Sequence, residues 1–330
     1  MMLPKVSLII PCYNAGKYIS RMLDSIIAQK YTPLELILIN DDSTDNTDDV
    51  IQQYLPLLKK NEIDVIYKTQ PNQGVGATVD NALKLFTGDY LCWADPDDYF
   101  EPGSFIERVN FLKAHPKYAI VTSGAYIRPA ENLSKFKEMS AFYSNRYDPD
   151  QFHVALLDKS ICCSGCYMVR VSAFLTVNPK RSIYRSRAGQ NWQMLLPVYY
   201  KFKQAFLDKP LYNYVIYPSS HSHGDSTLQE KLARIDGHED IINKTLKMIE
   251  ETQKVNLSNY YNISGSHFAG RRLAVYAEFK NKDGFYKTLK DKKHLYGLTF
   301  KDYILVLKLF LGPKISMFIY KMLHFKNIFK

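Results

Sequence analysis

The first 130 residues alternate between two kinds of apolar pattern, and this alternation limits the possible folds more than any other feature. Short runs rich in β-branched residues are typical of buried strands, whereas apolar residues that recur every three or four positions are typical of helices. Strands are expected at 5–13, 34–40, 64–69, 89–94 and 118–127, and helices at 15–29, 43–58, 76–86 and 102–115. Such alternation predicts an α/β fold with a mostly parallel sheet and helices on both faces.

Polar residues cluster where the first four expected strands end or in the loops that follow them. The clusters are Pro11–Asn14, Asn40–Asp45, Asn72–Gly76 and Asp95–Asp98. In parallel sheets, ligands bind outside the carboxyl ends of the strands. We therefore expect one cleft to gather all four clusters.

Three carboxylates stand within four positions of the last cluster, at Asp95, Asp97 and Asp98. Like charges this close raise each other's pKa unless a cation lies among them. Such a turn is a suitable site for Mg²⁺ or Mn²⁺, which would bridge to phosphate oxygens. The alternative is a solvated turn whose aspartates cap the following helix, and these residues alone leave both interpretations open.

The positive charge is concentrated in the C-terminal third. Residues 1–227 hold 24 Lys and Arg against 23 Asp and Glu, whereas residues 228–330 hold 19 against 10. The later part also shows helical spacing without further strand signals, most clearly at 228–254. We expect an α/β domain over 1–227 and a basic helical region over 228–330, with an anionic partner for the latter.

The cysteines and the start of the chain point to a reducing compartment. The five cysteines are odd in number and irregularly spaced, and the start has no charged leader or small-residue cleavage site. The stretch "CCSGC" at 162–166 lacks a second Cys or His pair at the spacing of a structural zinc site. Buried thiols and a cytoplasmic protein are expected.

The order of four motifs closely resembles that of family 2 glycosyltransferases. The motifs are "VSLIIPCYNAGKYISRMLDSIIAQ", "LELILINDDSTDNT", "NQGVGA" and "GDYLCWADPDDYFEPGSF", and the resemblance covers roughly residues 5–225. It implies the GT-A fold, a Rossmann-like, mostly parallel sheet that binds a nucleotide sugar, here with a helical C-terminal extension. The stretch "GVGATV" lacks the third glycine of a dinucleotide fingerprint, so an NAD enzyme is not expected.

The resemblance also implies roles for individual residues. Asp41 would accept a hydrogen bond from the base, and the aspartate run would hold the ribose, the diphosphate and the cation. Glycines would let the backbone approach the nucleotide closely. For the donor these residues are Pro11, Tyr13, Asn14, Asp41, Asp42, Gly74, Gly76, Asp95 and Asp97; for the metal they are Asp97, Asp98 and a histidine, His223 in preference to His221.

The chain departs from the family at three places. Asp42 replaces a glycine, and Val79 stands near the place of an arginine. Most seriously, Gln190 and Asn191 stand where the family usually has a general base, and an amide cannot act as one at neutral pH.

Three explanations stay open for the missing base. In the first, a carboxylate from another segment acts as the base, with Asp150, Asp158 and Asp225 as options. In the second, Gln190 only orients the acceptor, and phosphate or water assists weakly as the base. In the third, the protein binds its ligand without catalysis. Gln190, Asn191 and Asp98 are the expected catalytic residues.

Residues 298–330 carry six lysines among Leu, Ile, Phe and Tyr, and no apolar run there reaches the roughly 20 residues that span a bilayer. An interfacial helix pair on anionic lipid is expected, which would place the protein at the inner face of the membrane. The alternative is a helical pair packed on the domain. No nucleic-acid-binding motif accompanies the charge.

Together these features predict a metal-dependent, inverting transferase. It would move a single sugar from a nucleotide-diphosphate sugar, expected to be a UDP-sugar, to a lipid-linked or surface glycan. The processive motif Gln-x-x-Arg-Trp is missing, which favours single additions. The rivals are a catalytically inactive nucleotide-sugar-binding or scaffold protein and a sugar nucleotidyltransferase, although the latter's glycine-rich basic N-terminal loop is not present.

Overall fold

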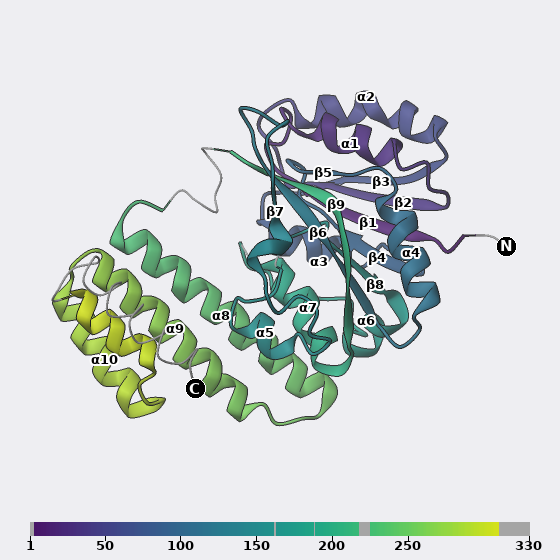
Figure 1. The fold of residues 1–330 in the computed structure, drawn as a ribbon. Coiled ribbons are helices and arrows are strands. Elements are labelled where there is room, and N and C mark those ends of the chain that lie inside the picture. Colours follow the sequence, from purple (N-terminus) through teal and green to yellow (C-terminus); the bar gives the residue numbers. More distant parts are fainter. Residues whose placement is uncertain (1–2, 162, 188, 218–224, 310–330) are drawn as a thin grey trace. The chain divides into compact units, whose positions relative to one another are not determined.

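The computed structural model describes residues 3–161, 163–187, 189–217 and 225–309 (Figure 1). Contacts divide the chain into two compact units. Unit 1 comprises Met1–Ser220 and Lys247–Val255, and unit 2 comprises His221–Leu246 and Asn256–Lys330. The described residues expected to bind the donor, the metal or the acceptor lie in unit 1, whereas Asp225, one of the optional bases, lies in unit 2. The division into domains 1–227 and 228–330 stays a prediction.

The first half of unit 1 contains the parallel strands that the sequence predicts. They occupy neighbouring places in the order β3-β2-β1-β4. β1, β2 and β4 are largely buried. β3 is the outermost strand, and its residues are mostly half-buried or exposed. Their bounds are β1 (Val6–Cys12), β2 (Leu34–Asn40), β3 (Ile63–Thr69) and β4 (Tyr90–Trp93).

The second half makes the sheet mixed. Among the described residues the sheet has nine strands, in the order β3-β2-β1-β4-β8-β6-β9-β5, with β7 paired to β6. β8 runs antiparallel to both β4 and β6, whereas β9 runs parallel to β6. The parallel arrangement is thus confirmed for β1–β4 and does not extend to every later strand. The bounds are β5 (Tyr99–Phe100), β6 (Ile120–Pro129), β7 (Lys137–Glu138), β8 (Tyr167–Arg170) and β9 (Gln204–Ile216).

Helices cover both faces of the first four strands. Figure 1 shows α1 (Ile19–Ile27) and α2 (Thr47–Lys60) together on one side and α3 (Val75–Ala82) on the other. The chain steps in one direction across the sheet from β1 to β3 and then returns to place β4 on the other side of β1. Because crossovers between parallel strands are right-handed, this change of direction puts α3 on the face opposite α1 and α2. The remaining helices of unit 1 are α4 (Ser104–Ala114), η1 (Met139–Phe142), α5 (Phe152–Leu156), α6 (Val171–Val177) and α7 (Gln190–Lys201).

Four cysteines confirm the expectation of buried thiols. Cys12, Cys92, Cys163 and Cys166 are buried and free, and Cys162 lies outside the described residues.

Unit 2 contains most of α8 (Leu228–Gln253), together with α9 (Ser258–Glu278), α10 (Lys282–Leu295) and a helix over 300–309. Leu305, Val306 and Leu309 pack against a core that includes Leu273 and Phe285. Lys292 and Asp302 form a buried ion pair at 2.5 Å, each side chain only 2% exposed. One side of residues 299–309 is therefore packed within unit 2, while Phe300 and Tyr303 are exposed. The interfacial helix pair stays a prediction, and its residues 310–330 lie outside the described residues.

None of the helices among the described residues is long and apolar enough to cross a membrane.

Candidate functional site

The carboxyl ends of the parallel strands bring the predicted clusters together at one edge of the sheet. The register aligns Cys12 with Asn40, and Asn40 with Thr69. The backbone N–H of Asp41 donates to the carbonyl oxygen of Cys12 (2.8 Å), and that of Gln70 donates to the carbonyl of Asn40 (3.0 Å). Backbone hydrogen bonds thus continue past the ends of these strands and join the loops that follow them.

Asp41 is the centre of the loop over residues 70–74. Its side chain is buried, and Oδ1 accepts hydrogen bonds from Gln70 Nε2 (2.8 Å) and the Gln73 N–H (3.0 Å). Oδ2 accepts one from the Gly74 N–H (2.8 Å). A carboxylate oxygen can accept two hydrogen bonds, so Oδ2 keeps capacity for a donor such as a base N–H.

The loops after β1 and β2 hold each other in place through Asn14. Its N–H donates to Ser43 Oγ (3.0 Å), and its side-chain oxygen accepts from the Thr44 N–H (2.9 Å). Pro11 lies near the end of β1, and the ring of Tyr13 is half exposed beside it. Asp42 has a φ of +60°, in the left-handed region, which explains why a glycine suits this position.

The three aspartates of the turn differ in depth. Asp98 is buried, and its Oδ1 accepts a hydrogen bond from the Val215 N–H of β9 (2.8 Å). Its Oδ2 is buried without a hydrogen-bond partner among the described residues. Asp95 and Asp97 are partly buried on the same turn.

The pKa values of all three aspartates are raised, chiefly by burial, and repulsion contributes at Asp95 and Asp98. Burial and the charge of Asp97 raise the pKa of Asp95 to about 7, and burial raises the pKa of Asp97. Burial, together with the charges of Asp97 and Asp95, raises the pKa of Asp98 well above its usual range. A cation bound among these groups would offset the repulsion and give Asp98 Oδ2 a partner.

The aspartate turn fits a divalent cation only in part. Within the described ranges, no three His, Cys, Asp or Glu side chains converge closely enough to hold a metal ion by themselves. His221 and His223 lie outside those ranges. A cation held by Asp97 and Asp98 would need further oxygens from water or from a ligand's phosphates, as Mg²⁺ commonly does.

Arg21 of α1 holds the turn from the other side, and sequence reasoning missed it. Its Nη2 donates to the carbonyl oxygen of Asp97 and to the hydroxyl of Tyr217 (2.7 Å). Its guanidinium lies over the ring of Tyr99, 5.1 Å from the centroid. Arg21 is the one basic residue in the stretch 19–27, but nothing local indicates a partner 76 positions away.

Gly74 and Gly76 permit a close approach, but to protein rather than to open space. A Cβ on Gly76 would lie 2.4 Å from the carbonyl oxygen of Ser186, and one on Gly74 would lie 3.1 Å from Cγ of Arg187. The Gly76 N–H donates to that same Ser186 carbonyl at 2.9 Å. Residues 186–187 occupy the space that a Cβ would need at these glycines, which is a reason for glycine that the sequence did not indicate; contact of their backbone with the nucleotide stays a prediction.

Gln190 and Asn191 begin α7, directly after Gly189 with its φ of +72°. Asn191 Oδ1 accepts hydrogen bonds from Trp93 Nε1 (2.6 Å) and Ser164 Oγ (3.2 Å). These bonds attach the start of α7 to the end of β4, two residues before Asp95. Asn191 therefore positions α7 at this edge of the sheet, and the partly exposed Gln190 precedes it.

Among the alternative carboxylates, Asp150 and Asp158 are exposed, and Asp225 is bonded to Arg234 in unit 2 (2.7 Å).

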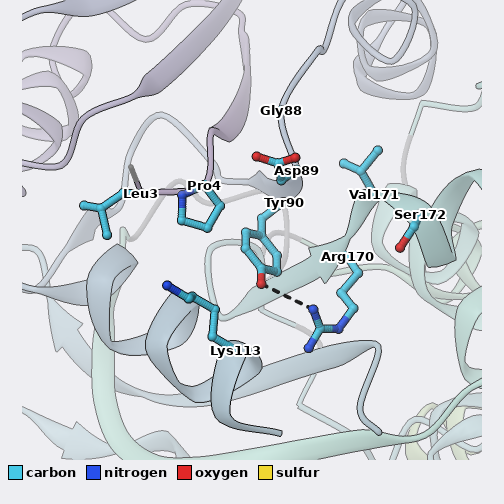
Figure 2. A pocket seen from close by; sticks show the side chains of 9 residues that line it. All are labelled: Leu3, Pro4, Gly88, Asp89, Tyr90, Lys113, Arg170, Val171 and Ser172. Carbon is cyan, nitrogen blue, oxygen red and sulfur yellow. Dashed lines mark hydrogen bonds between the residues drawn. The ribbon is translucent and has the colours of Figure 1, made fainter. Parts of the chain in front are cut away.

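A separate groove of about 720 Å³ lies at the other end of the parallel strands, beside the starts of β1 and β4 (Figure 2). Tyr90, at the start of β4, accepts a hydrogen bond from Arg170 at 3.3 Å there. None of the predicted site residues lines it. The lining residues are Leu3, Pro4, Gly88, Asp89, Tyr90, Lys113, Arg170, Val171 and Ser172.

Comparisons with known proteins agree on one family. Residues 7–177, more than half of the chain, match the model described as glycosyl transferase family 2. The chain is 30% identical to EpsE of Bacillus subtilis (strain 168) over 194 residues, which are 58% of this chain and 66% of that protein. It is 28% identical to the chondroitin synthase of Pasteurella multocida (strain Pm70) over 260 residues, 78% of this chain but 24% of that protein. The chain thus spans under two thirds of EpsE and about a quarter of the synthase.

Two solved structures share the fold. S. aureus TarS 1–349 in complex with UDP-GlcNAc has a TM-score of 0.56 at 17% identity, covering 88% of this chain and 92% of that one. The mannosyltransferase PcManGT from Pyrobaculum calidifontis, in complex with GDP-Man and Mn²⁺, has a TM-score of 0.56 at 12% identity, covering 98% and 84%.

Proposed function

Because this chain belongs to glycosyltransferase family 2, we propose that it transfers a single sugar from a nucleotide-diphosphate sugar to a glycan hydroxyl. The family and the GT-A fold that the motif order predicts are both confirmed. The finer parts of the proposal are a UDP-sugar donor, inversion at the anomeric carbon, a divalent cation, and an acceptor that is a lipid-linked or surface glycan.

The observation that carries the proposal is the pairing of two unlike clusters at one edge of the sheet. The Asp41 loop offers a buried carboxylate with spare acceptor capacity, which suits a base N–H. The aspartate turn offers Asp95, Asp97 and Asp98, whose Oδ2 has no hydrogen-bond partner in the described part of the chain; this suits a cation and the groups around a diphosphate. TarS and PcManGT, which share the fold, have been crystallised with UDP-GlcNAc and with GDP-Man and Mn²⁺.

Asp97 and Asp98 would hold the cation, which when bound supplies Lewis-acid stabilisation of the charge that develops on the leaving diphosphate. Arg21 keeps this turn in place through the Asp97 carbonyl. In the reaction the acceptor oxygen forms a bond to the anomeric carbon while the bond from that carbon to the phosphate oxygen breaks. The acceptor's proton passes to phosphate or water, because Gln190 and Asn191 cannot take it.

Gln190 is the residue that we assign to the acceptor. Asn191 is engaged with Trp93 and Ser164, so its oxygen already accepts two hydrogen bonds. Gln190 precedes it at the start of α7 and is partly exposed. Its amide would orient the acceptor hydroxyl without removing the proton.

We further propose that unit 2 brings the protein to anionic lipid at the inner face of the membrane, where a lipid-linked acceptor would lie. Its exposed side chains include Tyr286, Phe300 and Tyr303 among several lysines. Aromatic rings and lysines together favour the interface of an anionic membrane.

Calorimetric titration with UDP and with GDP, in the presence and absence of Mn²⁺, tests the donor site. We expect binding that Mn²⁺ strengthens, and we expect the double variant Asp97→Asn and Asp98→Asn to lose the metal effect. Asn can still accept the Val215 N–H, so the fold should survive. Asp49→Asn, exposed on α2, is the control. An unchanged metal effect in the double variant would sink the assignment.

A nucleotide-release assay with a panel of glycan acceptors tests catalysis separately. Nucleotide binding without release under any acceptor would favour the one alternative that an observation supports, a binding protein without transfer. That observation is the engagement of Asn191, at the family's usual base position, in two structural hydrogen bonds.

A further inference from the structure

Residues 182–187, which connect α6 to α7, form a segment that we call the strap. Its first anchor is Asp80 of α3, whose side chain is buried. Asp80 Oδ1 accepts from Ser182 Oγ (2.6 Å) and from the Ile183 N–H (3.0 Å). Its Oδ2 accepts from Arg185 Nη2 (2.9 Å). These charge-assisted bonds hold the first part of the strap against α3.

The second anchor is Gln193 of α7, which is also buried. Its Oε1 accepts from the Tyr184 N–H (2.7 Å), and its Nε2 donates to Ser186 Oγ (3.1 Å). Contacts with these two buried side chains alternate along residues 182–186, so this part of the strap has little freedom to shift.

The strap passes directly over the Asp41 loop. The Gly76 N–H donates to the Ser186 carbonyl (2.9 Å), and Cα of Arg187 lies 3.3 Å from where a Cβ on Gly74 would be. The Gly74 N–H in turn donates to Asp41 Oδ2. Arg187 is thus separated from the expected base-binding carboxylate by a single residue.

Ser186 and Asn191 are bonded to the two different halves of the donor site. Ser186 is bonded to Gly76, beside the Asp41 loop. Asn191 is bonded to Trp93, two residues before Asp95. A nucleotide sugar with its base at Asp41 and its phosphates at the aspartate turn would contact these same two halves.

The two arginines of the strap have different surroundings. Arg185 is bonded to Asp80, to Gln73 Oε1 (3.2 Å) and to Asn81 Oδ1 (2.9 Å), so its guanidinium is occupied by protein. Arg187 is exposed, and its side-chain stem lies against Gly74. Val79, which stands near the place where the family often has an arginine, is fully buried and carries no charge into the site.

We propose that Arg187 contacts the diphosphate of the donor. The inference rests on the proposed function, because it presumes a nucleotide-sugar donor. The guanidinium can pair with two phosphate oxygens at once, and the anchored strap presents it at little conformational cost. Arg185 has a different role, which is to hold the strap.

Calorimetric titration of the full chain with nucleoside and nucleoside diphosphate separates these roles. The probes are uridine and UDP, and guanosine and GDP, each with Mn²⁺ present. For Arg187→Gln we expect the diphosphate to bind about tenfold more weakly or worse, with the nucleoside unchanged. Arg187→Lys should fall between Gln and the wild type. Lys180→Gln, an exposed cation just before the strap, should leave both affinities unchanged.

The outcomes that overturn the inference are distinct. Equal weakening of nucleoside and diphosphate by Arg187→Gln would mean that the residue shapes the strap and does not touch phosphate. An unchanged diphosphate affinity would mean that it makes no contact. If the wild-type chain binds neither UDP nor GDP, the proposed function fails first and the inference fails with it. A thermal melt of Arg187→Gln that matches the wild type confirms that the variant is folded.

Discussion

Glu35 is a carboxylate buried near the start of β2, and both of its oxygens have partners. Its oxygens accept from Ser7 Oγ (2.6 Å), from the N–H and Oγ1 of Thr87 (2.8 and 2.6 Å), and they pair with Lys5 Nζ (2.9 Å). Burial by itself would raise its pKa, but the hydrogen bonds from Ser7, Thr87 and Lys5 outweigh burial and lower the pKa.

The lowered pKa of Glu35 gives a pH-dependent contribution to stability. The group ionises more readily in the folded chain, so its contribution is complete above the unfolded-state pKa of about 4.3 and is lost as pH falls through the folded-state pKa. We expect Glu35→Gln to lower the free energy of unfolding by about 2 kcal/mol at pH 7. Urea denaturation at pH 7, 5, 4 and 3 should show this difference unchanged down to pH 5 and shrinking below pH 4.

Asp64→Asn is the matched control, because Asp64 also pairs with Lys5 but is exposed. It should change stability by less than about 0.5 kcal/mol at each pH. A Glu35→Gln difference that stays constant from pH 7 to 3 would contradict the assigned role of the carboxylate.

Asp42 carries backbone strain that a glycine would relieve. Its φ of +60° lies in the region that residues with a Cβ reach only at a cost. We expect Asp42→Gly to raise the free energy of unfolding by about 0.5 kcal/mol, since the gain is partly offset by greater freedom of the unfolded chain. Asp42→Ala should lower it by about 1 kcal/mol. Chemical denaturation at neutral pH distinguishes the two, and equal effects would indicate that side-chain loss dominates.

At the scale of elements, periodicity is sufficient to predict β1–β4 and the helices between them. Their apolar residues repeat locally, and local repetition is what a strand or an amphipathic helix requires. The same reasoning places the polar clusters at one edge of the sheet, because parallel strands end together. The reversal of β8 and the register of β9 depend on pairing between distant segments, which no local pattern encodes.

Contacts between distant segments also escape prediction from local sequence inside the candidate site, as the strap shows. Asp80 and Ser182 are bonded across 102 positions, and Arg21 and Tyr217 across 196. The residues next to each of these four in the sequence do not indicate which distant residue it will contact. The sequence identifies Gly74 and Gly76 as positions that need space, but only the fold shows that protein fills that space.

Gly76 allows α3 and the strap to touch, and a larger residue should separate them. The Cβ of an alanine would lie 2.4 Å from the Ser186 carbonyl oxygen and 2.6 Å from its nitrogen, so backbone would have to move. We expect Gly76→Ala to lower the free energy of unfolding by about 2 kcal/mol and to weaken nucleoside binding. The measurements are chemical denaturation and calorimetry with uridine.

Gly237→Ala is the control for this substitution. Gly237 lies within α8, and a Cβ there would have no atom within 4 Å. Alanine should stabilise the helix by up to about 1 kcal/mol and leave uridine binding unchanged. If both glycines respond alike, the close approach at Gly76 is not what requires it.

At the scale of the whole molecule, two truncations separate the packing of residues 299–309 from any role of residues 310–330. A chain that ends at residue 298 loses Asp302 and leaves Lys292 as a buried charge without its partner. We expect that truncation to destabilise unit 2 by about 3 kcal/mol or more in thermal or chemical unfolding. A chain that ends at residue 309 keeps this ion pair and the packing of Leu305 and Leu309, so it should unfold like the full chain.

The longer truncated chain also isolates the membrane proposal. Full-length protein should bind anionic vesicles more weakly at high salt, because salt screens the attraction between lysines and lipid headgroups. If the chain ending at 309 binds UDP like the full chain but no longer binds vesicles, residues 310–330 carry the lipid contact. Equal vesicle binding would assign the contact to residues before 310, and no binding by either chain would remove the membrane proposal.

Unit 1 is discontinuous along the chain, since it takes Lys247–Val255 from beyond residues that belong to unit 2. Gln253 Nε2, for example, donates to the carbonyl oxygen of Pro197 in α7 (3.1 Å). During synthesis the ribosome releases residues in order, so the donor site's own unit cannot be complete until residue 255 has emerged. Any fragment cut at 227 would lack that last piece, and a protease that nicks α8 would damage both units with one cleavage.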